Sequence, residues 1–133
     1  MPVVTLTVRK PKSPAFKSGV LEAVHAALVG AGVPPDDLFQ RVLELDAEAF
    51  RFDPMYPDVR TRRTDDFVFV EILWVAGRSA ELKRQTAAAI ARGLSAIGID
   101  PENLMVCFQD APAENWSAAG GRSLRRMPLG ALG

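Results

Sequence analysis

Two segments of this chain resemble each other at a constant offset of 66 residues, and this internal repeat constrains the fold more than any other feature of the sequence. Residues 32–38 read GVPPDDL, and residues 98–104 read GIDPENL. In each copy a glycine ends a helix-like pattern, a proline makes a turn and an apolar run follows. The repeat therefore predicts a duplicated strand–helix–strand unit.

Hydrophobic periodicity supports such a unit in the first half. Residues 2–9 alternate between two faces, which is typical of a strand with a buried face. Residues 14–30 repeat apolar side chains at helical spacing, after a Ser13 cap and a Pro14 start. A strand-like run covers residues 39–45, so the first half reads strand, helix, strand.

The second half repeats this order. Between the halves, residues 49–65 contain two prolines, four arginines and no clear period, which favours a long loop. The final residues are rich in glycine and small side chains, so they are either mobile or held by something outside their own domain. The second half contains a strand over 67–75, a helix over 79–94 and a strand over 104–108. We expect one domain consisting of a β-α-β unit at 2–48, the loop at 49–65, a second unit at 66–110 and a tail at 111–133.

The predicted fold class is α/β, of the α+β kind. A right-handed crossover makes the two strands of each unit parallel, and two units side by side give one four-stranded mixed sheet with both helices on one face. The strand at 67–75 is apolar on both faces, yet the chain has no third helix to cover the second face. We therefore expect copies of the chain to associate through their sheets.

Composition excludes several classes of partner. Basic and acidic residues balance at 16 each, which does not favour nucleic acid or an anionic membrane. No apolar run approaches the roughly 18 residues of a spanning helix. The single cysteine, Cys107, cannot form an internal disulfide and is expected to be a small buried hydrophobic residue. These features predict a soluble, cytoplasmic protein.

Four stretches carry a family resemblance: residues 1–3, 33–40, 77–83 and 115–117. Together with the doubled unit, they resemble the tautomerase superfamily, and within it the branch of malonate semialdehyde decarboxylase and cis-3-chloroacrylic acid dehalogenase. The resemblance implies a homotrimer with three sheets packed around a central axis, which would cover the open sheet face. It also implies catalysis without a cofactor.

Pro2 is the predicted catalyst. Removal of Met1 is expected because proline is small, and it exposes a secondary amine. An unperturbed α-amino group has a pKa of about 8. Burial in an apolar pocket or a neighbouring cation would lower the pKa of this amine toward ambient pH, which suits a group that both accepts and returns a proton. The alternative is a proline that simply follows methionine at a strand edge.

Arg78 and Asp37 are the other predicted catalytic residues. Arg78 could hold a substrate carboxylate and stabilise an enolate, or it could be a solvated arginine at a helix start. The resembling enzymes have a further arginine where this chain has Val75, so Val75 counts against decarboxylation and dehalogenation. Asp37 matches an acidic residue of the decarboxylase, where it could orient the amine or a water. Asn103 at the equivalent repeat position instead favours a turn-stabilising role for both.

Three further residues are predicted to line the substrate site with Val75. His25 falls where the two resembling enzymes place a histidine, although its spacing equally fits a half-buried helix residue. Trp116 and Phe108 could form an apolar wall around the amine, or they could be core residues. The arginines of the long loop are expected to be solvated, unless one replaces the arginine that Val75 lacks: Arg60, Arg62 and Arg63.

The predicted function is a tautomerase or isomerase that moves a proton on a small 2-oxo acid or its enol. A lyase or hydratase acting on an unsaturated or β-keto acid is the first alternative, and a non-enzymatic oligomeric binding module is the second. The expected ligand is a small carboxylate. No phosphate-binding loop or clustered His/Cys pattern points to a cofactor or a metal.

Overall fold

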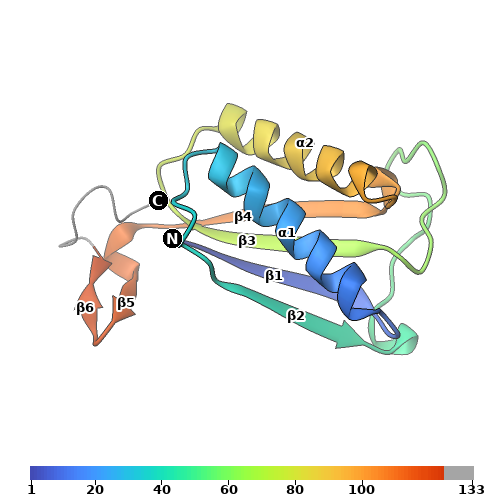
Figure 1. Ribbon diagram of the computed structural model, residues 1–133, viewed down its shortest axis with the longest axis horizontal. Helices are drawn as coiled ribbons and strands as arrows, with labels where there is room; N and C mark the ends of the chain where they lie inside the picture. Colours follow the sequence, from blue (N-terminus) through green and yellow to red (C-terminus); the bar gives the residue numbers. More distant parts are fainter. Residues whose placement is uncertain (125–133) are drawn as a thin grey trace.

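The computed structural model describes residues 1–124 as a four-stranded sheet with two helices on one face (Figure 1). The sheet order is β2-β1-β3-β4. The first and last pairs of neighbours are parallel, and the central pair, β1 and β3, is antiparallel. The predicted mixed sheet of two β-α-β units is therefore confirmed. The elements are β1 (Pro2–Arg9), α1 (Pro14–Gly30), β2 (Gln40–Leu45), β3 (Val68–Val75), α2 (Ala80–Ala96) and β4 (Leu104–Ala111).

An approximate two-fold axis between β1 and β3 relates the two units. Pro2 pairs with Trp74, and Val68 pairs with Val8. Val68 lies 66 residues after Pro2, and Trp74 lies 66 residues after Val8. The two pairs are therefore related by the offset of the sequence repeat. Because β1 and β3 run in opposite directions, equivalent residues of the two units lie at opposite ends of the sheet.

The core lies between the sheet and the helices. Both helices begin at the predicted serine caps, where the side-chain oxygens of Ser13 and Ser79 accept hydrogen bonds from backbone N–H groups one turn later. Alternation along β1 and β3 directs every second side chain toward the helices. Neither helix within residues 1–124 is long and apolar enough to cross a membrane. The buried core side chains include Val4, Leu6, Val8, Val20, Val24, Leu28, Val70, Ile72, Trp74, Ile90 and Leu94.

The second sheet face carries no helix (Figure 1). Its exposed apolar side chains include Leu43, Leu73 and Met105. Cys107 also lies exposed on this face, so its predicted burial is wrong. The reason is the parity of β4: Val106 and Phe108 pack against the core, and Cys107 between them must point the other way.

The long loop is more structured than expected. It follows a short 3₁₀ turn, η1 (Ala47–Ala49), and folds around the guanidinium of Arg63, which is 8% exposed. Arg63 Nη1 donates to the Asp53 carbonyl at 2.9 Å and to the Tyr56 carbonyl, and the guanidinium lies over the Phe67 ring. For Arg63 the expectation of a solvated side chain is therefore wrong, because loop carbonyls and an aromatic ring replace its water.

The first part of the predicted tail is held by the domain itself. After β4 come a turn, η3 (Ala113–Asn115), and a small hairpin of β5 (Ser117–Ala119) and β6 (Arg122–Ser123). Leu124 follows the hairpin and is 1% exposed, and its backbone N–H donates to the Trp116 carbonyl. The rest of the predicted tail, residues 125–133, lies outside the described residues.

Candidate functional site

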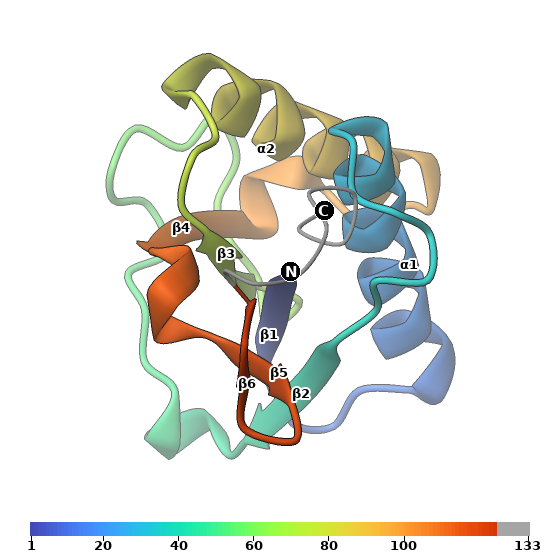
Figure 2. The same cartoon turned by 90° about the vertical axis from the view of Figure 1, so that its left-hand side faces the viewer.

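The first residue of the chain is buried at the end of β1, beside the end of β3 (Figure 2). The Met1 carbonyl accepts a hydrogen bond of 3.2 Å from the Val75 backbone N–H, and Pro2 pairs with Trp74. Met1 is only 9% exposed. This pairing fixes the Pro2 nitrogen at the sheet end, next to the segment that leads from β3 into α2.

Asp37 faces this N-terminus. The turn that places it is closed by a bond from the Asp37 N–H to the Pro34 carbonyl, as the repeated motif predicts. The Asp37 side chain is 9% exposed, and its Oδ2 lies 2.8 Å from the Met1 ammonium. Apart from this ion pair, neither carboxylate oxygen accepts a hydrogen bond from a residue among 1–124. A buried carboxylate needs a compensating cation, so Asp37 and the N-terminal amine are electrostatically matched.

Arg78 lies on the segment between β3 and α2. Its Nη1 donates to the Val75 carbonyl at 2.9 Å, and its guanidinium lies 4.9 Å from the centre of the Trp74 ring. Burial lowers the pKa of Arg78, and the nearby carboxylates of Asp37 and Asp110 oppose that shift. Asp37 is therefore near enough to Arg78 to influence its pKa electrostatically.

Apolar residues enclose the Met1 side chain. Val75 and Leu124 are buried against it, and Ala113 and Trp116 pack on the same cluster. The Trp116 indole N–H donates to the Ala111 carbonyl at 3.1 Å, which fixes the ring beside the sheet end. The site therefore combines an apolar wall with a carboxylate and a guanidinium.

The structure brings five predicted site residues into one neighbourhood: Pro2, Asp37, Val75, Arg78 and Trp116. Phe108 is not among them. It faces the helices in the core, where its ring stacks on Trp74 with 6.1 Å between ring centres, so the prediction of a pocket wall is wrong for this residue. Its position in β4 gives it the parity of the core residues.

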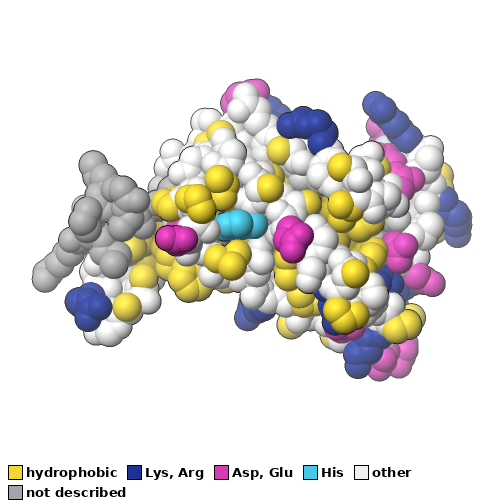
Figure 3. Space-filling model, viewed as in Figure 1, with side chains coloured by type: hydrophobic (Ala, Val, Ile, Leu, Met, Phe, Trp, Pro, Cys, Tyr) yellow, Lys and Arg dark blue, Asp and Glu magenta, His cyan; other side chains and the backbone are white. Residues whose placement is uncertain are grey.

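His25 lies apart from the Met1 cluster. Its Nε2 donates to the Pro35 carbonyl at 2.9 Å, on the outer side of α1. There it lines a shallow surface pocket with Leu21, Leu38 and Gln40. Figure 3 shows the histidine at the surface of the molecule, among hydrophobic and acidic side chains.

Three residues at the site were not predicted from the sequence. Met1 was treated only as a residue to be removed, Leu124 lay in the glycine-rich tail, and Trp74 was assigned only to a strand. Nothing in the sequence distinguishes Leu124 from the other large apolar side chains of the same segment. The sequence carries no comparable signal for Met1, because its burial depends on the fold around it.

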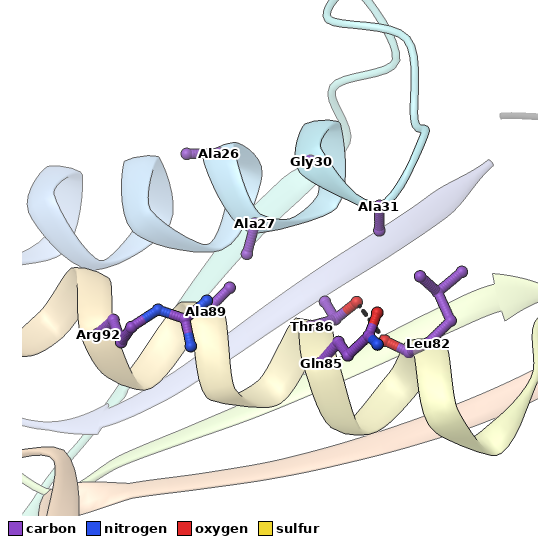
Figure 4. A pocket seen from close by; sticks show the side chains of 9 residues that line it. All are labelled: Ala26, Ala27, Gly30, Ala31, Leu82, Gln85, Thr86, Ala89 and Arg92. Carbon is purple, nitrogen blue, oxygen red and sulfur yellow. Dashed lines mark hydrogen bonds between the residues drawn. The ribbon is translucent and has the colours of Figure 1, made fainter.

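Proton transfer is the chemistry that these groups support. Among residues 1–124 there is no group of three or more His, Cys, Asp or Glu side chains that could hold a metal. A groove of about 230 Å³ lies between the helices, and none of the site residues named above lines it (Figure 4). Small side chains and Thr86, whose hydroxyl donates to the Leu82 carbonyl, line much of it. At the end of β1 the amine and the Asp37 carboxylate form an ion pair, and Arg78 donates to the carbonyl of Val75 at the neighbouring end of β3.

Comparison with known proteins identifies relatives of this chain in sequence and in fold. A family model described as "Tautomerase enzyme" matches residues 37–119. The chain is 26% identical to the probable tautomerase YusQ of Bacillus subtilis (strain 168), over 92% of this chain and 97% of that protein. It also resembles the crystal structure of malonate semialdehyde decarboxylase, with a TM-score of 0.82 and 23% identity over 90% of this chain and 92% of that chain. A fused 4-OT described as a symmetric trimer gives a TM-score of 0.73 and 24% identity, over 92% of this chain and 96% of that chain.

Proposed function

Because the chain belongs to the tautomerase enzyme family, we propose that it is a cofactor-independent isomerase that moves a proton on a small 2-oxo acid or its enol. The amine of Pro2, exposed by removal of Met1, is the proposed acid–base group. One observation carries the proposal: the buried N-terminus forms an ion pair with the Asp37 carboxylate at the end of β1, where it pairs with β3.

The position of the exposed amine follows from covalent geometry. The Pro2 nitrogen is three bonds from the Met1 nitrogen, so the two atoms lie within about 4 Å of each other. In the processed chain the Pro2 amine would therefore stay close to Asp37, where the Met1 ammonium lies at 2.8 Å. The carboxylate would favour the protonated amine, whereas Arg78 and the apolar wall would favour the neutral base.

The proposed reaction uses these groups in sequence. The neutral amine takes a proton from C3, the carbon next to the substrate carbonyl, and the electrons of that C–H bond move into an enolate. Removal of Met1 frees the Val75 N–H, which can then donate to the enolate oxygen. Arg78 holds the substrate carboxylate, and the Pro2 ammonium returns its proton to the oxygen or to carbon. Donors fixed before the reaction stabilise the charge that develops in it.

Exchange of the C3 protons of 2-oxobutanoate for deuterium, followed by NMR, tests this function. Processed wild-type protein should catalyse the exchange, and Pro2→Ala should reduce kcat/KM about 100-fold or more, as expected for loss of a general base. A form with a tag left ahead of Pro2 should be similarly inactive. Mass spectrometry of the N-terminus and matched circular dichroism spectra are the controls. Full activity in either blocked form would refute the proposed role of Pro2.

A lyase or hydratase is the second candidate. Asp37 and Arg78 share one site, so a carboxylate could orient water while a guanidinium binds a β-keto or unsaturated acid. Val75 weighs against this candidate, because it is apolar and 3% exposed. It cannot supply the further arginine contact that the resembling enzymes have at this position. Release of carbon dioxide from a β-keto acid or of halide from 3-chloroacrylate, faster than proton exchange, would favour this candidate. A binding module, the third candidate, predicts neither reaction.

The proposed assembly is a homotrimer. Its support is the open sheet face, where Leu43, Leu73 and Met105 are each more than one third exposed. A fused 4-OT of the same fold is described as a trimer. Packing three such faces around an axis would bury apolar side chains that a monomer leaves in water.

A further inference from the structure

We propose that the space filled by the Met1 side chain becomes the substrate's side-chain subsite once Met1 is removed. The substrate is then a 2-oxo monocarboxylate, or its enol, whose C3 carries an unbranched apolar chain of about four non-hydrogen atoms, like the side chain of methionine. This inference rests on the proposed function of Pro2.

The first support is the fit of Met1 itself. Its side chain is enclosed by Val75, Leu124 and Trp116, and the residue is 9% exposed. The wall belongs to other parts of the chain, namely the end of β3 and the segment around the hairpin. Loss of Met1 breaks the bond that the Val75 N–H makes to it but leaves Leu124 and Trp116 joined by their backbone hydrogen bond. An apolar ligand can therefore occupy the same space.

The second support is the alignment of Met1 with the proposed reaction. The Met1 carbonyl accepts from the Val75 N–H, as the substrate's carbonyl oxygen would. The Met1 Cα is two bonds from the Pro2 nitrogen and its carbonyl carbon is bonded to it, so a substrate that is not bonded to this nitrogen would lie about 1–2 Å farther away along the same direction. The side chain on Met1 Cα then points where a substituent on C3 would point.

The third support comes from the two-fold axis within the chain. At the opposite end of the sheet, the residues offset by 66 are Phe67 for Met1, Phe50 for Trp116 and Arg9 for Val75. There the Phe67 ring is 2% exposed and lies 5.7 Å from the Phe50 ring. The fold thus leaves space for a side chain at both ends of the sheet. An internal residue fills it permanently at one end, whereas a removable residue fills it at the other.

The comparison of Val75 with Arg9 also indicates the charge of the ligand. At the opposite end, the Arg9 guanidinium lies over the Phe52 ring and pairs with Asp65 at 2.9 Å. At the candidate site the same position holds Val75, which offers no charge to a second carboxylate. Burying an unpaired carboxylate against Val75 and Leu124 would be strongly unfavourable. The subsite therefore selects a monocarboxylate over a diacid.

Deuterium exchange at C3 across a series of 2-oxo acids tests the inference in processed protein. From 2-oxobutanoate to 2-oxoheptanoate, kcat/KM should rise about fourfold for each added methylene, since each one removes a CH₂ from water. Further lengthening, branching at C4 or a terminal carboxylate, as in 2-oxoadipate, should reduce it about tenfold. Equal rates along the series, with exchange still dependent on Pro2, would overturn the subsite and leave the proposed function standing. Exchange that is independent of Pro2 would overturn both.

A wall variant sharpens this test. Leu124→Ala enlarges the space, so the preferred chain should become longer by one or more methylenes. Ile97→Ala, which truncates an exposed residue at the end of α2, should leave the preference unchanged. An unchanged preference in Leu124→Ala would contradict the assignment of this wall.

A binding measurement tests the subsite without turnover. Saturated carboxylates from butanoate to heptanoate should shift the methyl NMR signals of Val75 and Leu124 in processed protein, with affinity that rises with chain length. The tagged form, in which Met1 still fills the space, should show no such shifts. Equal affinity for all chain lengths, or shifts confined to other methyl groups, would overturn the inference.

Discussion

At the scale of single residues, Asp37 shows how a repeated position acquires a new role. Its equivalent, Asn103, is buried and joins two halves of the chain, because its Oδ1 accepts from the Thr64 N–H and its Nδ2 donates to the Thr64 hydroxyl. Asp37 and Asn103 therefore each bind the segment that precedes the first strand of a β-α-β unit. Only at Asp37 is that segment a chain terminus, and only there is the side chain charged. The turn-stabilising explanation fits Asn103, whereas the ion pair sets Asp37 apart.

Replacement of Asp37 tests its electrostatic role. Removal of a nearby negative charge disfavours the protonated Pro2 amine, so Asp37→Asn should lower the pKa of this amine. The acidic limb of the kcat/KM profile would then move to lower pH, because the neutral amine is the proposed base. Asp36→Asn, which changes the exposed neighbouring residue, is the control. An acidic limb that stays in place in Asp37→Asn would contradict the predicted coupling.

At the scale of elements, the long loop is attached to the short turn before β4, η2 (Pro101–Asn103). The Thr61 hydroxyl donates to Asp100 Oδ2 at 2.6 Å, and the Arg60 N–H donates to Glu102 at 2.6 Å. The repeat explains the turn, since it copies the turn that carries Asp37. The loop has no counterpart in the repeat, so its attachment could not be predicted from the pattern.

Acid titration of stability tests this attachment. The bonds from Thr61 and from the Glu102 N–H lower the pKa of Asp100. A lowered folded-state pKa means that the contribution to stability is present above the unfolded value of about 3.9 and is lost as the pH falls through the folded value. Urea titrations should therefore show a smaller loss of stability below about pH 4 in Asp100→Asn than in wild type. Thr61→Val should behave similarly, because it removes the largest cause of the shift. Identical acid profiles in all three proteins would contradict the attachment.

The sequence predicted the architecture better than the direction of individual side chains. The repeat and the periodicity were sufficient for the sheet, its mixed topology and the helices, and the resemblance brought Pro2, Asp37 and Arg78 to one site. Cys107 was misassigned because adjacent strand residues face opposite ways, and Phe108 belongs to the core because it has the parity of the core residues in β4. The burial of Arg63 and Leu124 depends on loops that carry no periodic pattern.

At the scale of the whole molecule, the open sheet face predicts the assembly state. Leu73 lies on this face in β3, beside Val3 of β1, and is 37% exposed, so a trimer packed through this face would bury it. Leu73→Lys should place a charge in that interface and shift the sedimenting species from three times the 14.4 kDa chain mass toward the monomer. Ala88→Lys, on the exposed side of α2, adds the same charge away from the sheet and should leave the mass unchanged. A wild-type protein that sediments as a monomer at micromolar concentration would rule out the proposed trimer, and its apolar sheet face would then require a different explanation.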